Sequence, residues 1–284
     1  DGEVSLERVP DVFDCWFESG SMPYGQKHFL GEAKDDFDPE NGKGFPARFI
    51  AEGLDQTRGW FYSLIVLGTA IFGKSPYQNV IVNGLVLAED GKKQSKSLRN
   101  YPDPMELADR TGIDAMRFYL LSSSIVKGED LNFSEKEVAE IQRKNIGRLN
   151  NVLSMYGMFD DGKIESKSDS NHILDRWIIA RLHQTTTDIT DGYKGYELDK
   201  ATRPVTEFID DLSVWYLRRS RDRLKGVRKS GGLSQGVASN SDARKNGVNL
   251  NSSCKEDEDI QLAMGTLRHT LMTLSQLMAP VMPF

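Results

Sequence analysis

Cysteine is scarce in this sequence and long hydrophobic runs are missing from it. The two cysteines, Cys15 and Cys254, lie far apart among 284 residues. This excludes a disulfide scaffold and a cysteine-rich zinc site, and it is typical of a reducing compartment. The longest apolar run, residues 65–72, is too short to cross a bilayer, because a spanning helix needs about 20 apolar residues. We therefore expect a cytoplasmic protein with no membrane partner.

Histidine is also rare, and the pattern of a targeting leader is missing. The four histidines, His28, His172, His183 and His269, show no metal-ligand spacing with one another or with carboxylates, so we expect no bound metal site in this chain. No Ser-His-Asp or Cys-His arrangement stands out. The sequence opens on Asp1 without a basic, apolar or small-residue leader, and we expect a piece of something longer.

The charges are unevenly distributed. The chain has 36 basic and 42 acidic residues, and its net charge of -6 argues against a general DNA-coating protein. Residues 1–140 hold 15 basic and 24 acidic residues, whereas residues 141–230 hold 17 and 13. The middle of the chain is therefore the part expected to face a polyanion.

The densest basic group follows Trp215 and Tyr216. Two interpretations stay open from the residues alone: contacts to phosphates beside a stacking aromatic ring, or a solvated helix face interrupted by Asp222. The basic residues of the group are Arg218, Arg219, Arg221, Arg223 and Lys225.

The sequence predicts an α/β fold for the first hundred residues and helices for the rest. Short apolar runs at residues 47–51 and 80–82 predict buried parallel strands, and residues 60–72 between them predict the crossover helix. Pro104 is placed to begin a helix, and Ser134 with Glu137 forms a capping box for a helix reaching about residue 158. Further helices are predicted at 105–110, 113–121, 175–188, 198–224 and 260–278, and the Gly-, Ser- and Asn-rich residues 226–253 predict a mobile loop.

Polar residues gather where the first predicted strand meets the crossover helix. That position is the usual ligand crevice of an open parallel sheet. Glu52 and Asp55 offer carboxylates for hydroxyl or ammonium groups, Gln56 offers an amide, and Gly53 lets a ligand approach the backbone. The alternative is that Asp55 or Thr57 only caps the helix that follows.

Two more segments are unusual. Residues 90–97 present lysines and hydroxyls on a glycine turn, which suits a triphosphate or pyrophosphate but lacks the spacing of a P-loop; a merely exposed loop is the alternative. Residues 14–21 place Trp16 and Phe17 among small and acidic residues, as the lining of an apolar pocket or as ordinary core aromatics.

Together these segments resemble the class I aminoacyl-tRNA synthetases, and within them the isoleucine-specific enzymes. Residues 93–97 correspond to the family's KMSKS loop, residues 52–61 resemble its isoleucine form, and residues 14–24 resemble the segment after the editing insertion. The implied fold is α/β then all-α. It comprises the C-terminal half of a Rossmann-like catalytic domain (1–100), a stem-contact connection (101–140) and a helical anticodon-binding domain (141–284) with a flexible loop at 226–256.

The resemblance implies an isoleucine–tRNA ligase. Such an enzyme activates L-isoleucine with ATP as substrate, with Mg²⁺ expected from the family, and transfers the amino acid to tRNA-Ile. The resemblance places Trp16 and Trp60 in the isoleucine side-chain pocket. The adenylate is assigned to Glu52, Gly53, Asp55 and Gln56, with Glu52 on the sugar side. Lys96 would neutralise phosphate charge, assisted by Lys93, and the tRNA contacts would be Arg218, Arg219 and Arg221.

The sequence departs from the family in three places, one of which is that it stops at Pro283-Phe284 before any C-terminal extension. Gln94 stands where the loop has Met, and no histidine begins the HxGH pattern of the family's other signature element. We therefore predict that this chain alone does not form the adenylate. A non-catalytic tRNA-binding or interaction module derived from a synthetase remains the alternative.

Overall fold

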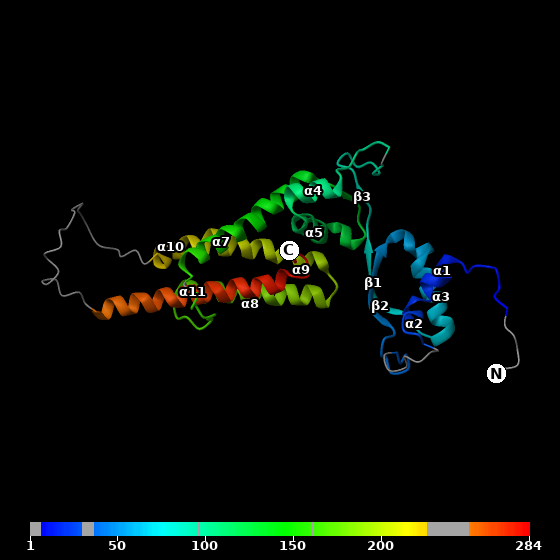
Figure 1. Cartoon of the computed structure of the whole chain (residues 1–284), viewed down its shortest axis with the longest axis horizontal. Helices are drawn as coiled ribbons and strands as arrows, with labels where there is room; N and C mark the ends of the chain where they lie inside the picture. The colour runs from blue at the N-terminus through cyan, green and yellow to red at the C-terminus, as the bar shows by residue number, and fades with distance from the viewer. Residues whose placement is uncertain (1–6, 30–36, 96, 161, 226–249) are drawn as a thin grey trace. The chain divides into compact units, whose positions relative to one another are not determined.

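The computed structural model describes residues 7–29, 37–95, 97–160, 162–225 and 250–284, with side chains from residue 258 onward in the last range. The chain divides into two compact units. Unit 1 comprises residues 1–94 and 124–132, and unit 2 comprises residues 95–123 and 133–284. Figure 1 labels helices and strands of both units.

Unit 1 is built around a strand–helix–strand unit. Strand β1 (Ala47–Gly53) leads through the short 3₁₀ helix η2 (Leu54–Arg58) into α3 (Trp60–Phe72), which returns the chain to β2 (Tyr77–Asn83). The two strands pair in parallel, with Ala47 opposite Tyr77 and Gly53 opposite Asn83. The predicted parallel pair and crossover helix are confirmed, but the expectation that the strands are buried is wrong, since Ile50 and Ile81 are the only buried residues in β1 and β2. Ile50, Phe61 and Leu64 form the small core between strand and helix.

Short elements complete unit 1. Helix α1 (Cys15–Gly20) packs on α3 and is followed by α2 (Met22–Gly25). After β2, strand β3 (Val86–Leu87) pairs in parallel with β4 (Leu131–Asn132), which follows the 3₁₀ helix η3 (Ser124–Lys127). Residues distant in sequence therefore support the chain just beyond the end of β2.

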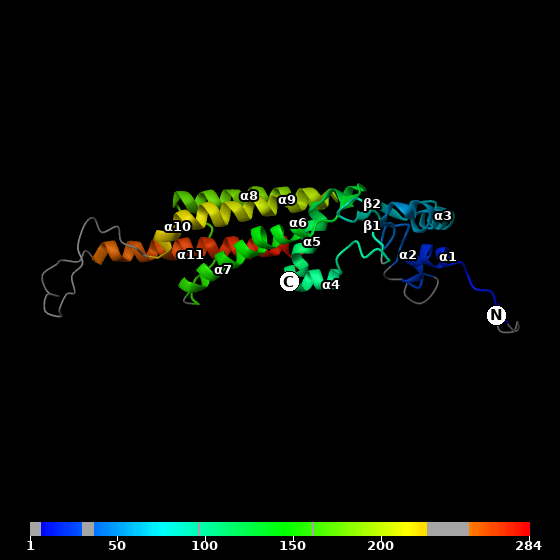
Figure 2. The same cartoon turned by 90° about the horizontal axis from the view of Figure 1, so that it is seen from above.

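Unit 2 is helical. Its α-helices are α4 (Pro104–Thr111), α5 (Ile113–Ser122), α6 (Glu135–Ile141), α7 (Gly147–Phe159), α8 (Ile173–Lys194), α9 (Leu198–Asp210), α10 (Arg218–Leu224) and α11 (Leu250–Met278). Two π-helical segments, η4 (Gln142–Ile146) and η5 (Asp211–Leu217), join α6 to α7 and α9 to α10. Helix α8 runs alongside α9 and alongside α11 (Figures 1 and 2). The predicted order, α/β followed by all-α, is confirmed.

The predicted helix starts are confirmed, but the predicted capping box forms only in part. Pro104 is the first residue of α4, and the Asp103 carboxylate accepts from the backbone N–H of Met105 at 2.8 Å. The Ser134 hydroxyl accepts from the backbone N–H of Glu137 at 3.3 Å, whereas the Ser134 N–H donates to the Tyr119 hydroxyl at 3.2 Å and not to the Glu137 side chain. Each cap satisfies an amide that has no partner within the helix, which fixes where the helix begins.

Two helix predictions need correction. The predicted helices at 134–158 and 198–224 each contain a π segment, whose wider turn inserts a residue without ending the helix. The loop predicted at 226–256 overlaps α11, which begins at Leu250. Adding turns to a packed helix is cheap compared with nucleating one, so polar residues there continue the helix. Residues 226–249 lie outside the described part.

The core of unit 2 lies between its long helices. It includes Ile178 and Leu182 of α8, Phe208 of α9, Tyr216 of η5 and Leu267 of α11, all fully buried. In the described ranges no helix is both long and apolar enough to cross a membrane.

Candidate functional site

The polar segment predicted as a ligand site lies at the carboxyl end of β1. Glu52 and Gly53 are the last residues of the strand, residues 54–58 form η2, and Trp60 begins α3. Gly53 lies opposite Asn83, the last residue of β2, so the segment and the chain leaving β2 start at the same edge of the parallel pair.

Hydrogen bonds tie this segment together. The Gln56 side-chain oxygen accepts from the backbone N–H of Trp60 at 3.0 Å, and its amide nitrogen lies 3.4 Å from the Asp55 carboxylate. The indole N–H of Trp60 donates to the backbone carbonyl of Ser19 in α1 at 3.0 Å. Gln56 therefore caps α3, which the sequence had suggested for Asp55 or Thr57, and the Asp55 carboxylate stays exposed.

Two glycines make room for these side chains. A Cβ on Gly59 would lie 2.9 Å from both the Gln56 oxygen and the Trp16 ring. A Cβ on Gly53 would lie 2.6 Å from the Asp55 carboxylate. The structure thus brings together five predicted site residues around these turns: Trp16, Gly53, Asp55, Gln56 and Trp60.

The resulting surface is open and chemically mixed. Trp16 is 45% exposed and Asp55 is exposed, so an apolar ring and a carboxylate both face solvent. Glu52 is exposed on β1, and no hydrogen bond among the described residues ties its side chain to this group. A ring of this kind suits a hydrocarbon side chain, and a carboxylate suits an ammonium or hydroxyl group.

The lysine-rich segment forms a tight turn after β3. The backbone N–H of Ala88 donates to the Lys92 carbonyl at 2.8 Å, and Gly91 takes a positive φ of 79° between them. Asp90 pairs with Lys92 at 2.9 Å; its hydrogen bond from Lys92 lowers the pKa of Asp90 and raises the pKa of Lys92. This turn fixes the direction in which the loop leaves.

The predicted catalytic lysines occupy different positions. Lys93 is exposed and bridges to Leu87 in antiparallel fashion, while the Gln94 amide lies 3.5 Å from the Leu87 carbonyl. Lys96 lies outside the described residues, and the boundary between the two units falls just after Gln94. The other loop residues are described, and the Ser95 hydroxyl lies 2.8 Å from the Ser97 hydroxyl.

A second segment holds the base of this loop. The Gly84 and Leu85 N–H groups donate to the Ile125 carbonyl and the Asp130 carboxylate, both at 2.9 Å. A Cβ on Gly84 would lie 1.9 Å from the Glu129 carbonyl oxygen, so only glycine lets the two backbones cross here. This support was not predicted, since nothing local to either segment signals the crossing.

The basic group of unit 2 divides into exposed and internal residues. Arg218, Arg219 and Arg221 are exposed, and the Arg219 guanidinium carbon lies 3.8 Å from the centre of the Trp215 ring. Arg223 is different, because its side chain is only 11% exposed. Neither interpretation left open for the basic group, a phosphate contact or a solvated helix face, fits Arg223.

A buried carboxylate holds Arg223. Asp175 of α8 accepts two hydrogen bonds from the Arg223 guanidinium, at 2.8 and 2.9 Å, and one each from the Tyr216 and Ser170 hydroxyls. Arg223 also pairs with Asp259 of α11 at 2.6 Å. Tyr216 is fully buried, so only Trp215 of the two aromatics reaches the surface.

Asp175 had a recognisable signal in the sequence. It lies three, four and seven residues before Ile178, Ile179 and Leu182, which places a carboxylate on the buried face of a predicted helix. Such a position requires a paired partner, although the sequence does not identify which one.

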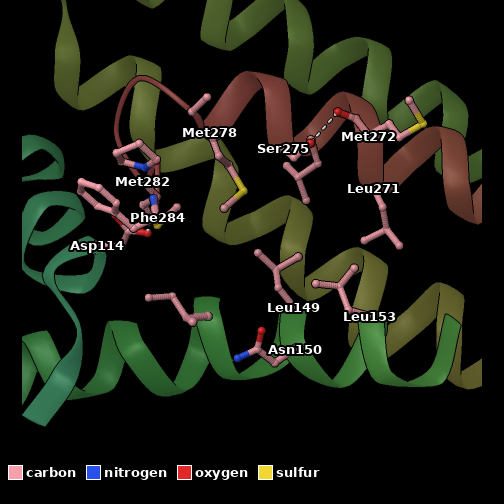
Figure 3. Close-up of a pocket in the computed structure, with 14 residues that line it drawn as sticks. Asp114, Leu149, Asn150, Leu153, Leu271, Met272, Ser275, Met278, Met282 and Phe284 are labelled. Carbon is pink, nitrogen blue, oxygen red and sulfur yellow. Dashed lines mark hydrogen bonds between the residues drawn. The ribbon is translucent and has the colours of Figure 1, made fainter. Parts of the chain in front are cut away.

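A separate cavity of about 460 Å³ lies in unit 2 between α7 and α11 (Figure 3). Leu149, Leu153 and Leu271 line it, and Asp114 accepts from the backbone N–H of Phe284 at one end. Burial raises the pKa of Asp114. The cavity contains none of the predicted site residues.

In the described part of the chain, no three His, Cys, Asp or Glu side chains are grouped to hold a metal ion. His172 instead caps α8, accepting from the Leu174 backbone N–H at 3.3 Å, and His269 lies 3.2 Å from the Ser166 hydroxyl.

Known protein families match both parts of the chain. Residues 1–134 match the family of class I tRNA synthetases (I, L, M and V), and residues 175–240 match the anticodon-binding domain of tRNA ligase.

Curated relatives cover most of this chain. The isoleucine–tRNA ligase of Chlamydia abortus is 48% identical over 78% of this chain and 21% of its own length. That of Bdellovibrio bacteriovorus is 43% identical over 100% and 24%, and the probable cytoplasmic one of Dictyostelium discoideum is 41% identical over 100% and 25%. The chain thus spans about a quarter of the length of these relatives.

Solved structures share the fold at low identity. Mycobacterium tuberculosis methionyl-tRNA synthetase in complex with methionyl-adenylate has a TM-score of 0.63 and 17% identity over 88% of this chain and 44% of its own. The ternary complex of an Agrobacterium radiobacter LeuRS with tRNA and LeuAMS has a TM-score of 0.61 and 17% identity over 97% and 30%.

Proposed function

Because this chain belongs to the class I tRNA synthetases, we propose that it supplies part of an isoleucine–tRNA ligase. The observation that carries the proposal is the match at 41% to 48% identity to isoleucine–tRNA ligases over 78% to 100% of the chain. The substrates would be L-isoleucine, ATP and tRNA-Ile. The isoleucine carboxylate attacks the α-phosphorus of ATP, pyrophosphate leaves, and the tRNA 3′ hydroxyl then displaces AMP from the adenylate.

The strand end of unit 1 is proposed to hold the amino acid and the adenylate. The Trp16 ring packs against Gly59, the residue before Trp60, and both tryptophans would contact the isoleucine side chain. Asp55 and Gln56 would hold the ammonium and adenylate groups, while Glu52, exposed next to Gly53, would face the sugar. A pocket of this kind separates isoleucine from valine by one methylene, a factor of about 10 to 200.

The lysine loop is proposed to neutralise phosphate charge. Lys93 and Lys96 would lie against the transferring phosphate, where a fixed cation lowers the barrier without acting as a nucleophile. The Asp130 carboxylate and the Gly84 crossing would act by holding the base of the loop. Gln94 replaces an apolar residue in this loop and bonds weakly to the Leu87 carbonyl.

The Mg²⁺ that accompanies ATP in this family is proposed to arrive with the nucleotide. Magnesium keeps several waters and binds substrate phosphates with one or two carboxylates. The described residues form no three-ligand cluster, so none of them is assigned to the ion. We also propose a cytoplasmic location, in line with the cytoplasmic label of the Dictyostelium relative.

The helical unit is proposed to contact tRNA. Its exposed arginines Arg218, Arg219 and Arg221 form the densest group of cations in a stretch whose net charge is positive. Phosphate contacts by such residues would position the tRNA rather than read its sequence. This proposal also holds for the alternative function, a tRNA-binding module without catalysis.

Binding of a non-hydrolysable isoleucyl-adenylate analogue separates the two functions. A ligase fragment keeps the amino-acid pocket, so we expect saturable binding of the isoleucyl analogue, weaker binding of the valyl analogue, and loss of binding in Asp55→Ala. The matched control is Asp38→Ala, an acidic residue elsewhere in unit 1. Equal binding of both analogues, or none of either, would favour the non-catalytic module.

A further inference from the structure

One surface of unit 2 combines two tryptophans and an arginine. Trp177 of α8 and Trp215 of η5 lie with ring centres 6.1 Å apart and ring planes tilted by 59°. Arg219, four residues after Trp215, places its guanidinium carbon 3.8 Å from the centre of the Trp215 ring. We call Trp177, Trp215 and Arg219 the tryptophan–arginine platform.

The platform is held from beneath. Tyr216, next to Trp215, is buried and donates its hydroxyl to Asp175 of α8 at 2.8 Å. The Arg181 guanidinium pairs with Asp211 at 2.8 Å and so links α8 to η5 a second time. Two links between the same elements fix the tryptophan rings before any ligand arrives, which lowers the entropy lost on binding.

The platform faces solvent. Trp215 is 44% exposed, and Arg219 is exposed, although the core of unit 2 is close by. An indole packed only for stability would be mostly covered, whereas a ring half open to water with a cation on it offers a flat, positively charged contact.

We propose that the tryptophan–arginine platform stacks an unpaired nucleobase of RNA. Aromatic rings and guanidinium planes are the groups on which proteins stack bases of single-stranded RNA. The inference rests on the proposed tRNA contact and deepens it, since it adds Trp177 and Trp215 to the exposed arginines and assigns base stacking to them together with Arg219.

The surrounding charge favours RNA over a protein partner. Arg218 and Arg221 are exposed on the same short helix as Arg219, where they can meet phosphates on either side of a stacked base. Of the nearby carboxylates, Asp211 is already paired with Arg181, which leaves Asp222 as the exposed acidic side chain within α10. An apolar protein face would gain nothing from these cations.

Base-dependent RNA binding by the full chain tests the proposal. The probes are a short labelled adenosine RNA and an abasic RNA of the same length and charge, measured by fluorescence anisotropy. We expect the wild-type chain to bind the adenosine RNA more tightly. Trp215→Ala should weaken that binding about tenfold and leave abasic binding unchanged, because the variant removes the stacking surface without changing the charge. Trp215→Phe keeps an aromatic face and should retain most of the preference.

Two controls separate stacking from charge and from general damage. Tyr62→Ala removes a more exposed aromatic side chain in unit 1, 64% exposed against 44% for Trp215, and should change neither affinity. Trp215→Ala should keep the salt dependence of binding, whereas Arg218→Ala should reduce its slope by about one.

Equal binding of adenosine and abasic RNA by the wild type would overturn the inference, as would an unchanged adenosine affinity in Trp215→Ala. A tRNA-Ile transcript serves as the third probe. If it binds in a salt-dependent way while either of those results is found, the platform inference fails and the proposed tRNA contact stands. If the wild type binds none of the three RNAs, the tRNA contact and the inference fail together.

Discussion

Asp175 and Arg223 form a two-pronged ion pair inside the helical unit, with N–O distances of 2.8 and 2.9 Å. The Asp175 side chain is fully buried and that of Arg223 is 11% exposed. Arg223 continues to Asp259, so a single guanidinium links α8, α10 and α11. Its role is to join helices, and the neighbouring exposed arginines are the ones left for a ligand.

Removing either member of this pair should strongly destabilise the chain. Asp175→Ala leaves the Arg223 charge without its buried partner, and the loss of a buried partner costs about 3–5 kcal/mol. We expect that decrease in the free energy of unfolding of unit 2, measured by urea denaturation.

The matched control is an exposed pair in the same unit. Arg110 and Glu135 lie 2.6 Å apart with side chains 61% and 43% exposed, and such pairs contribute less than about 1 kcal/mol. Arg110→Ala should therefore have a small effect. Similar decreases in the free energy of unfolding of the Asp175 and Arg110 variants would show that the buried pair contributes no more to stability than the exposed pair.

The stability of unit 2 should depend on the protonation of Asp175. Burial alone would raise the pKa of Asp175, but the hydrogen bonds from Arg223, Ser170 and Tyr216 outweigh it and hold the pKa below its usual value. A carboxylate with a lowered folded-state pKa contributes its full stability above the unfolded value of about 3.9 and loses it as the pH falls further.

Urea denaturation at several pH values measures this dependence. The wild type should lose stability steeply below pH of about 4, whereas Asp175→Asn, already destabilised, should show a shallower acid loss. Parallel pH profiles for the two proteins would contradict the assignment to Asp175.

Two helical glycines should respond in opposite ways to alanine. A Cβ on Gly192 of α8 would lie 2.6 Å from the backbone nitrogen of Ala201 in α9, so Gly192→Ala must push the helices apart at a cost of about 1–3 kcal/mol. Gly157 of α7 has nothing within 4 Å of its Cβ position, and Gly157→Ala should stabilise by about 0.5–1 kcal/mol. Thermal unfolding of both variants measures the two changes in stability. An unchanged stability in Gly192→Ala would show that α8 and α9 can move apart there without cost.

The exposed arginines should set the salt dependence of tRNA binding. The combined Arg218→Ala, Arg219→Ala and Arg221→Ala variant should bind a tRNA-Ile transcript more weakly and with a flatter dependence on salt, by about one unit of slope for each phosphate that the variant no longer neutralises. The control for general electrostatics is a second triple variant with the same net charge, in which Arg110, Arg143 and Lys200 are replaced by alanine. Equal slopes in the two triple variants would show that the three exposed arginines form an ordinary solvated helix face.

Sequence alone predicted the elements whose signals are local. The helix at residues 60–72 has the predicted bounds, because Gly73 ends it in a left-handed conformation with φ 63°. The helix start at Pro104 and the capping hydroxyl of Ser134 were likewise predicted from a few neighbouring residues.

Features that depend on distant partners were missed. Arg223 was grouped with its exposed neighbours because its partner Asp175 lies 48 residues earlier, and the Trp177–Trp215 contact joins two helices. The π segments were not predicted because one inserted residue hardly disturbs the apolar pattern of the helix. At the candidate site, the sequence and the family resemblance supplied the residue types, but only the structure showed that Gln56 caps α3 and that Trp16 packs against Gly59.

Isoleucine-dependent ATP–pyrophosphate exchange by this chain alone, with valine as the control amino acid, tests the central claim most directly. The claim is that the strand end and the lysine loop form part of an adenylate-forming site, while the HxGH element is missing from this sequence. We expect no exchange with either amino acid. Exchange selective for isoleucine would contradict it, because these residues would then suffice for the reaction.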